Sequence, residues 1–188
     1  MTFEPLSIAG AFLIRSESLV DERGSFARLV CAEEFARAGL EAAFVQQSIA
    51  RNHLRGTLRG LHLQLPPHAE AKYIRCIAGA MFDAVVDLRP TSPSYLQTAA
   101  VTIDADRGDA VFIPAGCAHG YQTLCDGTDV LYAMTTPYDP SSARVILWSD
   151  PRLAIAWPLE APTLSPRDAA APTLDAFLAR ERDALVQR

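Results

Sequence analysis

The chain has 188 residues, a hydrophobic content of 49% and a formal net charge of −5, as expected for an ordinary soluble globular protein with one domain over residues 1–188. The negative charge argues against nucleic acid as a partner, because such binding depends on the neutralisation of phosphates. It leaves open a local basic pocket for one small phosphorylated ligand.

Short β-rich segments separated by Gly, Pro and Asp dominate the sequence. Several of them alternate in the way that a half-buried strand does. Helical patterns occupy residues 32–39 and the C-terminal tail, about 173–188. Many short strands and few helices predict an all-β fold, a jelly roll (double-stranded β-helix) with short peripheral helices. In chain order, strands are expected over residues 25–31, 43–50, 56–64, 71–79, 80–89, 97–104, 109–114, 120–125 and 129–136.

Two segments match the sequence pattern of cupin-like barrels. The segment GDAVFIPAGCAHG ends a strand, turns the chain at proline and glycine, and directs His119 into the mouth of the barrel. The segment GTLRGLHLQ carries His62, followed by Gln64 where a metal-binding cupin has a second histidine. An amide oxygen beside imidazole is a poor ligand for first-row transition metals. We therefore expect no metal in this barrel.

The strand that carries His62 also presents other polar side chains. A glycine within a strand permits a bulge, which here would turn Arg59 toward the interior as well. Such a cation beside a histidine favours an anionic ligand, because burying the charge alone is costly. Simple alternation along this strand places on one face Leu58, Gly60, His62 and Gln64.

Three further side chains on neighbouring expected strands complete a set for proton transfer. Lys72 supplies a cation, Tyr132 a phenol acid, and Asp83 a carboxylate that either orients a catalytic group or closes a structural network with Arg75 or Lys72. Together with a histidine base, these groups suit the removal of a proton next to a carbonyl and its return from the other face.

In order along the chain, these motifs resemble the dTDP-4-dehydrorhamnose 3,5-epimerase family. The resemblance runs from about Asp21 to Asp168 and is carried by DERGSFARL, LRGLH followed by lysine, D-x-x-V-D-L-R, IP-x-G-x-AHG, W-x-DP and LSPRD. It implies an epimerase without metal or cofactor that inverts C3 and/or C5 of a nucleotide-linked 4-keto-6-deoxy sugar. It also implies a nucleoside-diphosphate sugar as substrate and a homodimer with exchanged N-terminal strands.

The resemblance implies catalytic roles for four residues. His62 would be the base at C3 and C5, Tyr132 the acid on the opposite face, and Asp168 the carboxylate that orients the histidine. Lys72 would stabilise the enolate oxygen. Asp83, singled out by its strand position alone, is the fifth catalytic candidate.

A second set of residues is expected to bind the substrate. The resemblance matches Arg23 with a nucleotide-contacting arginine and Gln47 with a pocket residue, and it implies a wall or stacking role for Tyr138. Phosphate is the natural ligand of such arginines, which can donate two parallel hydrogen bonds. The full set of substrate-binding candidates comprises Arg23, Arg28, Gln47, Arg59, His119, Tyr138 and Arg167.

At several positions the sequence departs from the family pattern. Arg28 stands where the pattern has glutamate, Ser48 and Ile49 replace polar residues, Ala143 replaces an acidic residue, and Arg167 replaces lysine. The proton-transfer set is intact, whereas the recognition set is altered. The nucleotide, the sugar and the number of inverted centres therefore stay open.

Two other functions stay open. A metal-dependent cupin oxygenase or isomerase would hold a stoichiometric metal. A non-catalytic cupin that binds sugar nucleotides would be stabilised by its ligand without any exchange of substrate protons.

The location of the protein is predicted from what the sequence lacks. The four cysteines have no C-x-x-C spacing, no run has the length of a transmembrane helix, and the N-terminus lacks the basic start and apolar run of a secretory signal. We expect reduced thiols in the cytoplasm and no membrane partner.

Overall fold

The computed structural model describes residues 1–186. Its secondary-structure elements, in chain order, are β1 (Thr2–Pro5), β2 (Phe12–Arg15), β3 (Ser18–Asp21), β4 (Gly24–Ala27), α1 (Ala32–Arg37), β5 (Gln46–Asn52), β6 (Leu58–Gln64), β7 (Lys72–Ala78), β8 (Ala80–Asp87), β9 (Thr98–Asp104), β10 (Ala110–Ile113), β11 (Cys117–Thr123), β12 (Thr128–Met134), β13 (Ala143–Val145), α2 (Pro166–Ala169) and α3 (Leu174–Val186).

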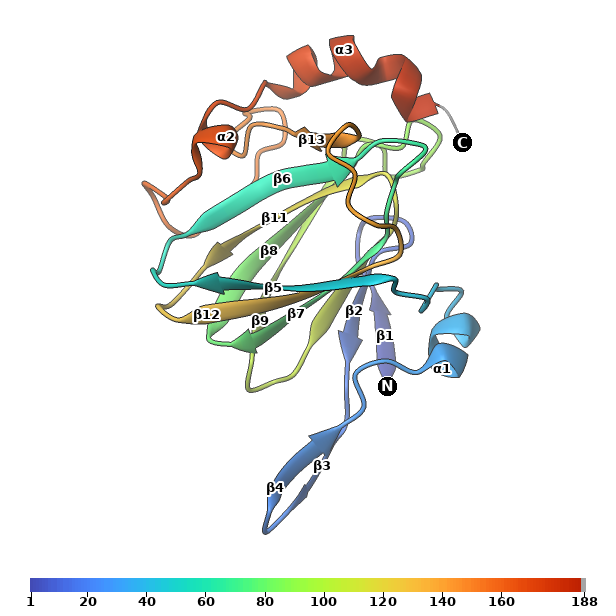
Figure 1. The fold of residues 1–188 in the computed structure, drawn as a ribbon, viewed down its shortest axis with the longest axis vertical. Helices are drawn as coiled ribbons and strands as arrows, with labels where there is room; N and C mark the ends of the chain where they lie inside the picture. Colours follow the sequence, from blue (N-terminus) through green and yellow to red (C-terminus); the bar gives the residue numbers. More distant parts are fainter. Residues whose placement is uncertain (187–188) are drawn as a thin grey trace.

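Two antiparallel sheets face each other and form the barrel (Figure 1). The strand order is β1-β2-β10-β7-β12-β5 in the first sheet and β13-β6-β11-β8-β9 in the second. Side chains at alternate positions of both sheets fill the space between them, which is why the strands show period-two patterns. The predicted all-β jelly roll is confirmed.

All nine predicted strands are present, although their ends differ. The strand expected over 25–31 is only β4, and the one expected over 120–125 begins earlier, at Cys117. The sequence did not predict β1, β2, β3, β13 or α2, which are each three or four residues long. These elements carry too few side chains for a periodic pattern, and β4 and β10, which are equally short, were predicted only as parts of longer segments. The tail helix is confirmed as α3, and residues 187–188 of that prediction lie outside the described residues.

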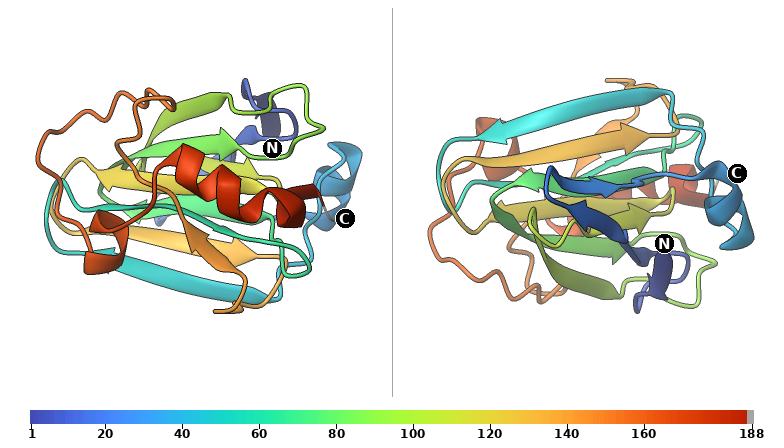
Figure 2. Two further views of the ribbon diagram at one scale, coloured as in Figure 1. Left: turned by 90° about the horizontal axis from the view of Figure 1, so that it is seen from above. Right: turned by 90° about the horizontal axis from the view of Figure 1, so that it is seen from below.

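The core has three parts, one between the sheets and one on the outer side of each. The interior cluster joins both sheets. On the second sheet, α3 lies across the outer face (Figure 2). It buries Leu174 and Phe177 in one cluster with Leu61, and each such side chain contributes about 1.5–3 kcal/mol when it is fully buried. On the first sheet, α1 buries Phe35 against Tyr73. Within residues 1–186 no helix is long and apolar enough to cross a membrane.

The β3–β4 hairpin projects away from the barrel (Figure 1). Its apolar side chains are unusually exposed, with 73% for Leu19, 76% for Val20 and 74% for Phe26. Such a concentration of exposed apolar residues marks an interaction surface more often than a free loop.

A buried carboxylate anchors the loop that follows β8. Asp87 accepts hydrogen bonds from the side chains of Arg89, Ser92 and Ser94. Burial acts to raise the pKa of Asp87, but these three hydrogen-bond donors outweigh it and lower the pKa from 3.8 to about 2. The network is therefore stable as long as the carboxylate is ionised.

Asp87→Asn is expected to lower the free energy of unfolding at pH 7 by about 2 kcal/mol, the stability linked to the shifted pKa. Because the folded pKa lies below the unfolded value, this contribution is complete above pH 4 or so and is lost as the pH falls toward 2. Urea titrations at a series of pH values should thus show that the free energy of unfolding falls less steeply toward acid pH in the variant. Asp106→Asn, at an exposed carboxylate, is the control, and an equal loss there would contradict the prediction.

Candidate active site

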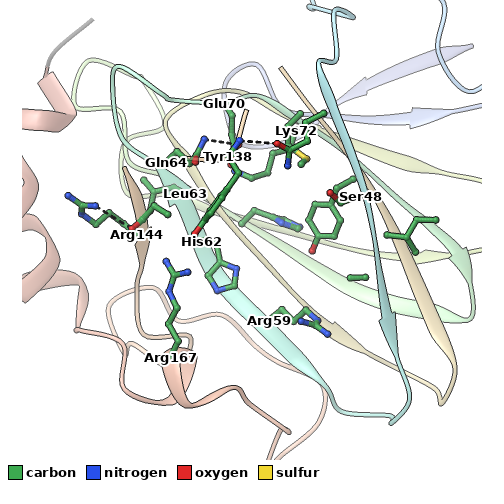
Figure 3. A pocket seen from close by; sticks show the side chains of 17 residues that line it. Ser48, Arg59, His62, Leu63, Gln64, Glu70, Lys72, Tyr138, Arg144 and Arg167 are labelled. Atoms are coloured by element: carbon green, nitrogen blue, oxygen red, sulfur yellow. Dashed lines mark hydrogen bonds and ion pairs between the residues drawn. The ribbon is translucent and has the colours of Figure 1, made fainter. Parts of the chain in front are cut away.

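A pocket of about 320 Å³ opens between the two sheets (Figure 3). Strand β6 of one sheet contributes His62 and Arg59, and strand β12 of the other contributes Tyr132. Lys72 from β7 and His119 from β11 also reach it. The pocket therefore gathers side chains from both halves of the barrel in one place.

A β-bulge in β6 turns both Arg59 and His62 toward the pocket. In the β6–β11 ladder, His62 pairs with His119 and Arg59 pairs with Tyr121, so two residues of β6 face one residue of β11. The predicted bulge is confirmed. The prediction that Leu58 shares the face of His62 is wrong, because the extra residue shifts the alternation by one position.

Close backbone contact explains the glycine at the bulge. A Cβ atom on Gly60 would come within 2.5 Å of the Cα atom of Gly120 on β11, and Gly60 has a φ of +144°. Neither condition suits a residue with a side chain. Gly60 thus allows β6 and β11 to approach closely at this point, and this close contact fixes the position of His62.

His62 is paired with a buried carboxylate. Its Nε2 atom lies 2.6 Å from Oδ1 of Asp168, whose side chain is 5% exposed, against 40% for the imidazole. Asp168 is held in α2 by the side chain of Ser165, which accepts the Asp168 backbone N–H at 3.1 Å. The arrangement leaves Nδ1 of His62 available as a base.

The environment keeps Asp168 ionised. Burial acts to raise the pKa of this carboxyl, but the hydrogen bond and charge of His62, the Ser165 side chain and the backbone N–H of Gly60 together hold the pKa below its ordinary value. A carboxylate in this position stabilises the positive charge that the imidazole carries after it has accepted a proton.

Tyr132 faces the pocket from the opposite sheet. Burial raises the pKa of its phenol well above the ordinary value, and the nearby Tyr121 and Asp83 add to the effect. Its ring centroid lies 6.0 Å from that of His119. Tyr132 is therefore protonated at neutral pH and is a hydrogen donor placed across the pocket from the base.

Asp83 lies behind the pocket and does not line it. Its Oδ2 atom is 2.7 Å from Nε2 of His119, and both side chains are almost fully buried. The alternative pairing with Arg75 or Lys72 is not found in the described residues, because β8 and β11 are adjacent and direct Asp83 and His119 into the same interior space. Asp83 therefore acts on the pocket through His119, which it contacts, and through the pKa of Tyr132.

Lys72 shares the pocket with a carboxylate that the sequence did not assign to the site. Its Nζ atom lies 3.0 Å from Oε1 of Glu70, and the second oxygen of Glu70 accepts a hydrogen bond from Gln64 at 3.0 Å. The Gln64 oxygen in turn accepts the backbone N–H of Asp139 at 2.6 Å. Gln64 therefore serves a local hydrogen-bond network in the position where a metal-binding cupin has a histidine.

No group of three His, Cys, Asp or Glu side chains within the described part of the chain is placed to hold a metal ion. The expected absence of a metal stays a prediction that elemental analysis of the purified protein can decide.

Three arginine side chains line the pocket on either side of His62 (Figure 3). Arg59 and Arg167, both predicted, line it, and so does Arg144, which was not predicted (Figure 3). Arg144 lies on β13, the short strand that pairs with β6, and donates a hydrogen bond of 2.7 Å to Glu181 of α3. Because β13 has only three residues, the sequence pattern did not predict that Arg144 lies on a strand of the site. Such an array suits the phosphates of an anionic ligand.

Three predicted substrate-binding residues lie outside this pocket in the single chain. Arg23, with its side chain 85% exposed, pairs with Asp21 in the β3–β4 hairpin, and Arg28 pairs with Glu34 at 3.3 Å. Both lie on the N-terminal segment, away from the barrel mouth. A chain taken alone therefore does not bring them to the site.

Gln47 is directed away from the pocket by strand alternation. Because Ser48 pairs with the inward-facing Tyr132 in the β5–β12 ladder, Ser48 and Gln46 line the pocket, and Gln47 lies on the outer face. Tyr138, in contrast, lines the pocket as predicted and is about half exposed.

In this jelly-roll barrel, a histidine–carboxylate pair and a protonated tyrosine lie on opposite sides of one pocket that arginines also line. These features define an isomerase of the proton-transfer type with an anionic substrate. The comparisons with known proteins agree with this class. A family model described as dTDP-4-dehydrorhamnose 3,5-epimerase matches residues 5–176. The chain therefore belongs to the dTDP-4-dehydrorhamnose 3,5-epimerase family, and it is an enzyme of the epimerase type.

Individual relatives cover nearly the whole chain. The dTDP-4-dehydrorhamnose 3,5-epimerase of Salmonella typhimurium is 37% identical over 93% of this chain and 96% of its own length. An epimerase structure from Mycobacterium tuberculosis is 35% identical, with a TM-score of 0.93, covering 100% of this chain and 94% of that one. A 3′-monoepimerase of Streptomyces bikiniensis, solved in complex with dTDP-quinovose, is 33% identical, with a TM-score of 0.83, covering 97% and 99% of the two chains.

Proposed function

We propose that this protein inverts C3, C5 or both centres of a nucleotide-linked 4-keto-6-deoxy sugar. The observation that carries the proposal is the opposition of the His62–Asp168 pair and Tyr132 across one pocket. Family membership supports the same reaction class. Inversion requires that a proton leaves one face of the sugar and another arrives at the opposite face, which two groups on opposite sheets can do.

The proposed reaction begins at Nδ1 of His62. The imidazole takes the proton from a carbon next to the C4 ketone, the C–H electron pair becomes the enolate, and Asp168 stabilises the imidazolium. Lys72 would stabilise the negative charge on the C4 oxygen, as a cation placed at a developing oxyanion does. Tyr132 then gives its O–H proton to the carbon from the other face, and a phenolate remains until solvent reprotonates it. Because C3 and C5 both neighbour C4, one mechanism serves both.

The arginine cluster gives the substrate its orientation. Arg59, Arg144 and Arg167 line the pocket, and the pyrophosphate of a nucleotide sugar would find hydrogen-bond donors among them. His119 and Tyr138 would then contact the sugar and the nucleoside. A dTDP sugar is the first substrate to test, because the relatives described above are dTDP-sugar epimerases.

We further propose a homodimer in which the β3–β4 hairpin of one copy covers the pocket of the other. The exposed Leu19, Val20 and Phe26 would be buried by such an exchange, and Arg23 at the hairpin would supply a further cation to the partner's nucleotide. The substrate-contact roles of Arg28 and Gln47, and the cytoplasmic location, stay predictions.

Arg23→Ala is expected to raise KM for the nucleotide sugar about tenfold, the cost of one charge-assisted contact with phosphate, with little change in kcat. Arg107→Ala, at another exposed arginine with a weak acidic partner, is the matched control. Sedimentation equilibrium should give the mass of two chains. A monomer with full activity and an unchanged KM in Arg23→Ala would contradict the exchanged dimer.

The experiment that tests the proposed reaction is incubation with dTDP-4-keto-6-deoxyglucose in deuterated water. Deuterium should enter C3, C5 or both, as followed by NMR and mass spectrometry. Deuterium at C3 alone would define a 3-epimerase. An absence of exchange with dTDP-, CDP-, GDP- and UDP-linked 4-keto sugars would overturn the proposal.

A further inference from the structure

Behind Tyr132 lies a buried polar network that the reaction as described does not use. It consists of Tyr121 on β11 and Asn52 at the end of β5, neither of which lines the pocket. Tyr121 is fully buried, and Asn52 is 3% exposed. Burying these polar atoms is costly unless each has a hydrogen-bond partner. Hydrogen bonds within the network and to its neighbours supply these partners.

The amide of Asn52 is fixed by the backbone. Its nitrogen donates hydrogen bonds to the carbonyl oxygens of Ala50 at 3.2 Å and Thr128 at 2.9 Å, so its Oδ1 atom must point the other way. That oxygen accepts two hydrogen bonds, from Nε of Arg59 at 2.9 Å and from the hydroxyl of Tyr121 at 3.2 Å. Asn52 thus joins a cation of the pocket to a buried phenol.

Tyr121 stands directly beside the proposed acid. Its ring centroid lies 6.4 Å from that of Tyr132 and 6.3 Å from that of His119. The β6 bulge is the cause of this arrangement, because it places Arg59 opposite Tyr121 in the ladder. While its proton is donated to Asn52, the Tyr121 hydroxyl adds to the effect of burial and raises the pKa of the neighbouring Tyr132 phenol, so the two phenols interact.

The proton given to the enolate leaves Tyr132 as a phenolate in a buried place, and such a charge needs a donor. We propose that Tyr121, held by Asn52, is a positioning residue whose O–H group donates to Asn52 while Tyr132 is protonated, and turns to the Tyr132 phenolate once that phenolate has formed, which stabilises it. The Tyr132 O–H bond breaks, the sugar C–H bond forms, and Tyr121 keeps its own proton. The charge of Arg59, which acts to lower the pKa of Tyr132, favours the same phenolate.

The inference rests on the proposed function, and it makes a prediction that the proposed function alone does not make. Removing the Tyr121 hydroxyl should slow proton donation by Tyr132 and leave proton removal by His62 intact. When the acid on the opposite face is impaired, the enolate takes a deuteron of solvent origin back on the His62 face. The sugar then returns to its original configuration but carries deuterium. The ratio of exchange to inversion should therefore rise, which a general loss of structure would not produce.

The test is Tyr121→Phe, a change of one hydroxyl group, assayed with dTDP-4-keto-6-deoxyglucose in deuterated water. Inversion should fall about 10- to 100-fold, the value of a hydrogen bond to a charged group, while deuterium incorporation into returned substrate changes less than about threefold. Tyr73→Phe removes the hydroxyl of another buried tyrosine, which donates to the backbone oxygen of Leu29, and should leave the ratio unchanged.

An unchanged ratio in Tyr121→Phe, or an equal fall of exchange and inversion, would overturn the positioning role. Failure of the proposed function itself looks different, because the unmodified protein would then show no exchange. Asn52→Asp keeps the acceptor oxygen but adds a negative charge beside the forming phenolate. We expect it to raise the exchange-to-inversion ratio as well, and a ratio equal to that of the unmodified protein would count against the network.

Discussion

His62→Ala is expected to lower deuterium incorporation at C3 and C5 by about 10³-fold, the typical contribution of a positioned general base. The imidazole has a free ring nitrogen and a buried carboxylate partner at 2.6 Å, and it is 40% exposed, whereas the other histidine of the pocket, His119, is 3% exposed. Without it, Asp168 lies behind the position of the ring and cannot reach the substrate carbon. The measurement is the initial rate of deuterium entry into the nucleotide sugar.

The control for this prediction is His53→Ala. His53 is exposed and does not line the pocket, so its removal should leave exchange within about twofold, the behaviour of an ordinary surface substitution. A thermal unfolding curve should show that His62→Ala is still folded. Exchange that survives in folded His62→Ala would mean that another group is the base.

Tyr132→Phe should separate the two halves of the reaction. Inversion should fall by about 10² to 10³-fold because the opposite face loses its acid, whereas exchange with return to the original configuration should fall far less. The high pKa that burial gives Tyr132 means that the phenol, and not the phenolate, is the species removed by this change. Chiral analysis of the product together with its deuterium content measures both rates in one sample.

A common loss of exchange and inversion in Tyr132→Phe would contradict the separate acid. It would place Tyr132 among the groups that bind the substrate or stabilise the enolate. Retention of full inversion would show that solvent or another residue supplies the second proton.

The parts of the fold that the sequence predicts well are those that repeat a pattern. Nine strands were predicted, several of them because they alternate over seven or eight residues, and Gly60 signals the bulge that brings Arg59 and His62 to the same face. The error at Leu58 has the same origin, since simple alternation takes no account of the extra residue. The strands that were missed, such as β13, have three or four residues and offer no comparable signal.

The candidate site also has features that the sequence predicts and features that depend on the folded structure. Gln64 in place of a histidine is visible in the sequence, but its engagement with Glu70 depends on the folded loop. The contact between His62 and Asp168 joins positions 106 residues apart, and only the family resemblance predicted it. The pairing of Asp83 with His119, and the presence of Arg144, depend on which strands become neighbours.

The location of Arg23 is a further case. The resemblance assigns it to the nucleotide, yet in the single chain it lies on an exposed hairpin. A residue that serves a site in a second copy cannot be placed by the geometry of one chain. The apolar exposure of Leu19, Val20 and Phe26 is the physical sign that links the two observations.

The most direct test of the account is a crystal structure of the protein with an unreactive nucleotide 6-deoxy sugar that lacks the C4 ketone. We predict that the sugar ring lies between the two sheets, with C3 or C5 facing Nδ1 of His62 on one side and the Tyr132 hydroxyl on the other. The pyrophosphate should contact Arg59 and Arg167. A sugar that has both His62 and Tyr132 on the same face of its ring would contradict the proposed inversion.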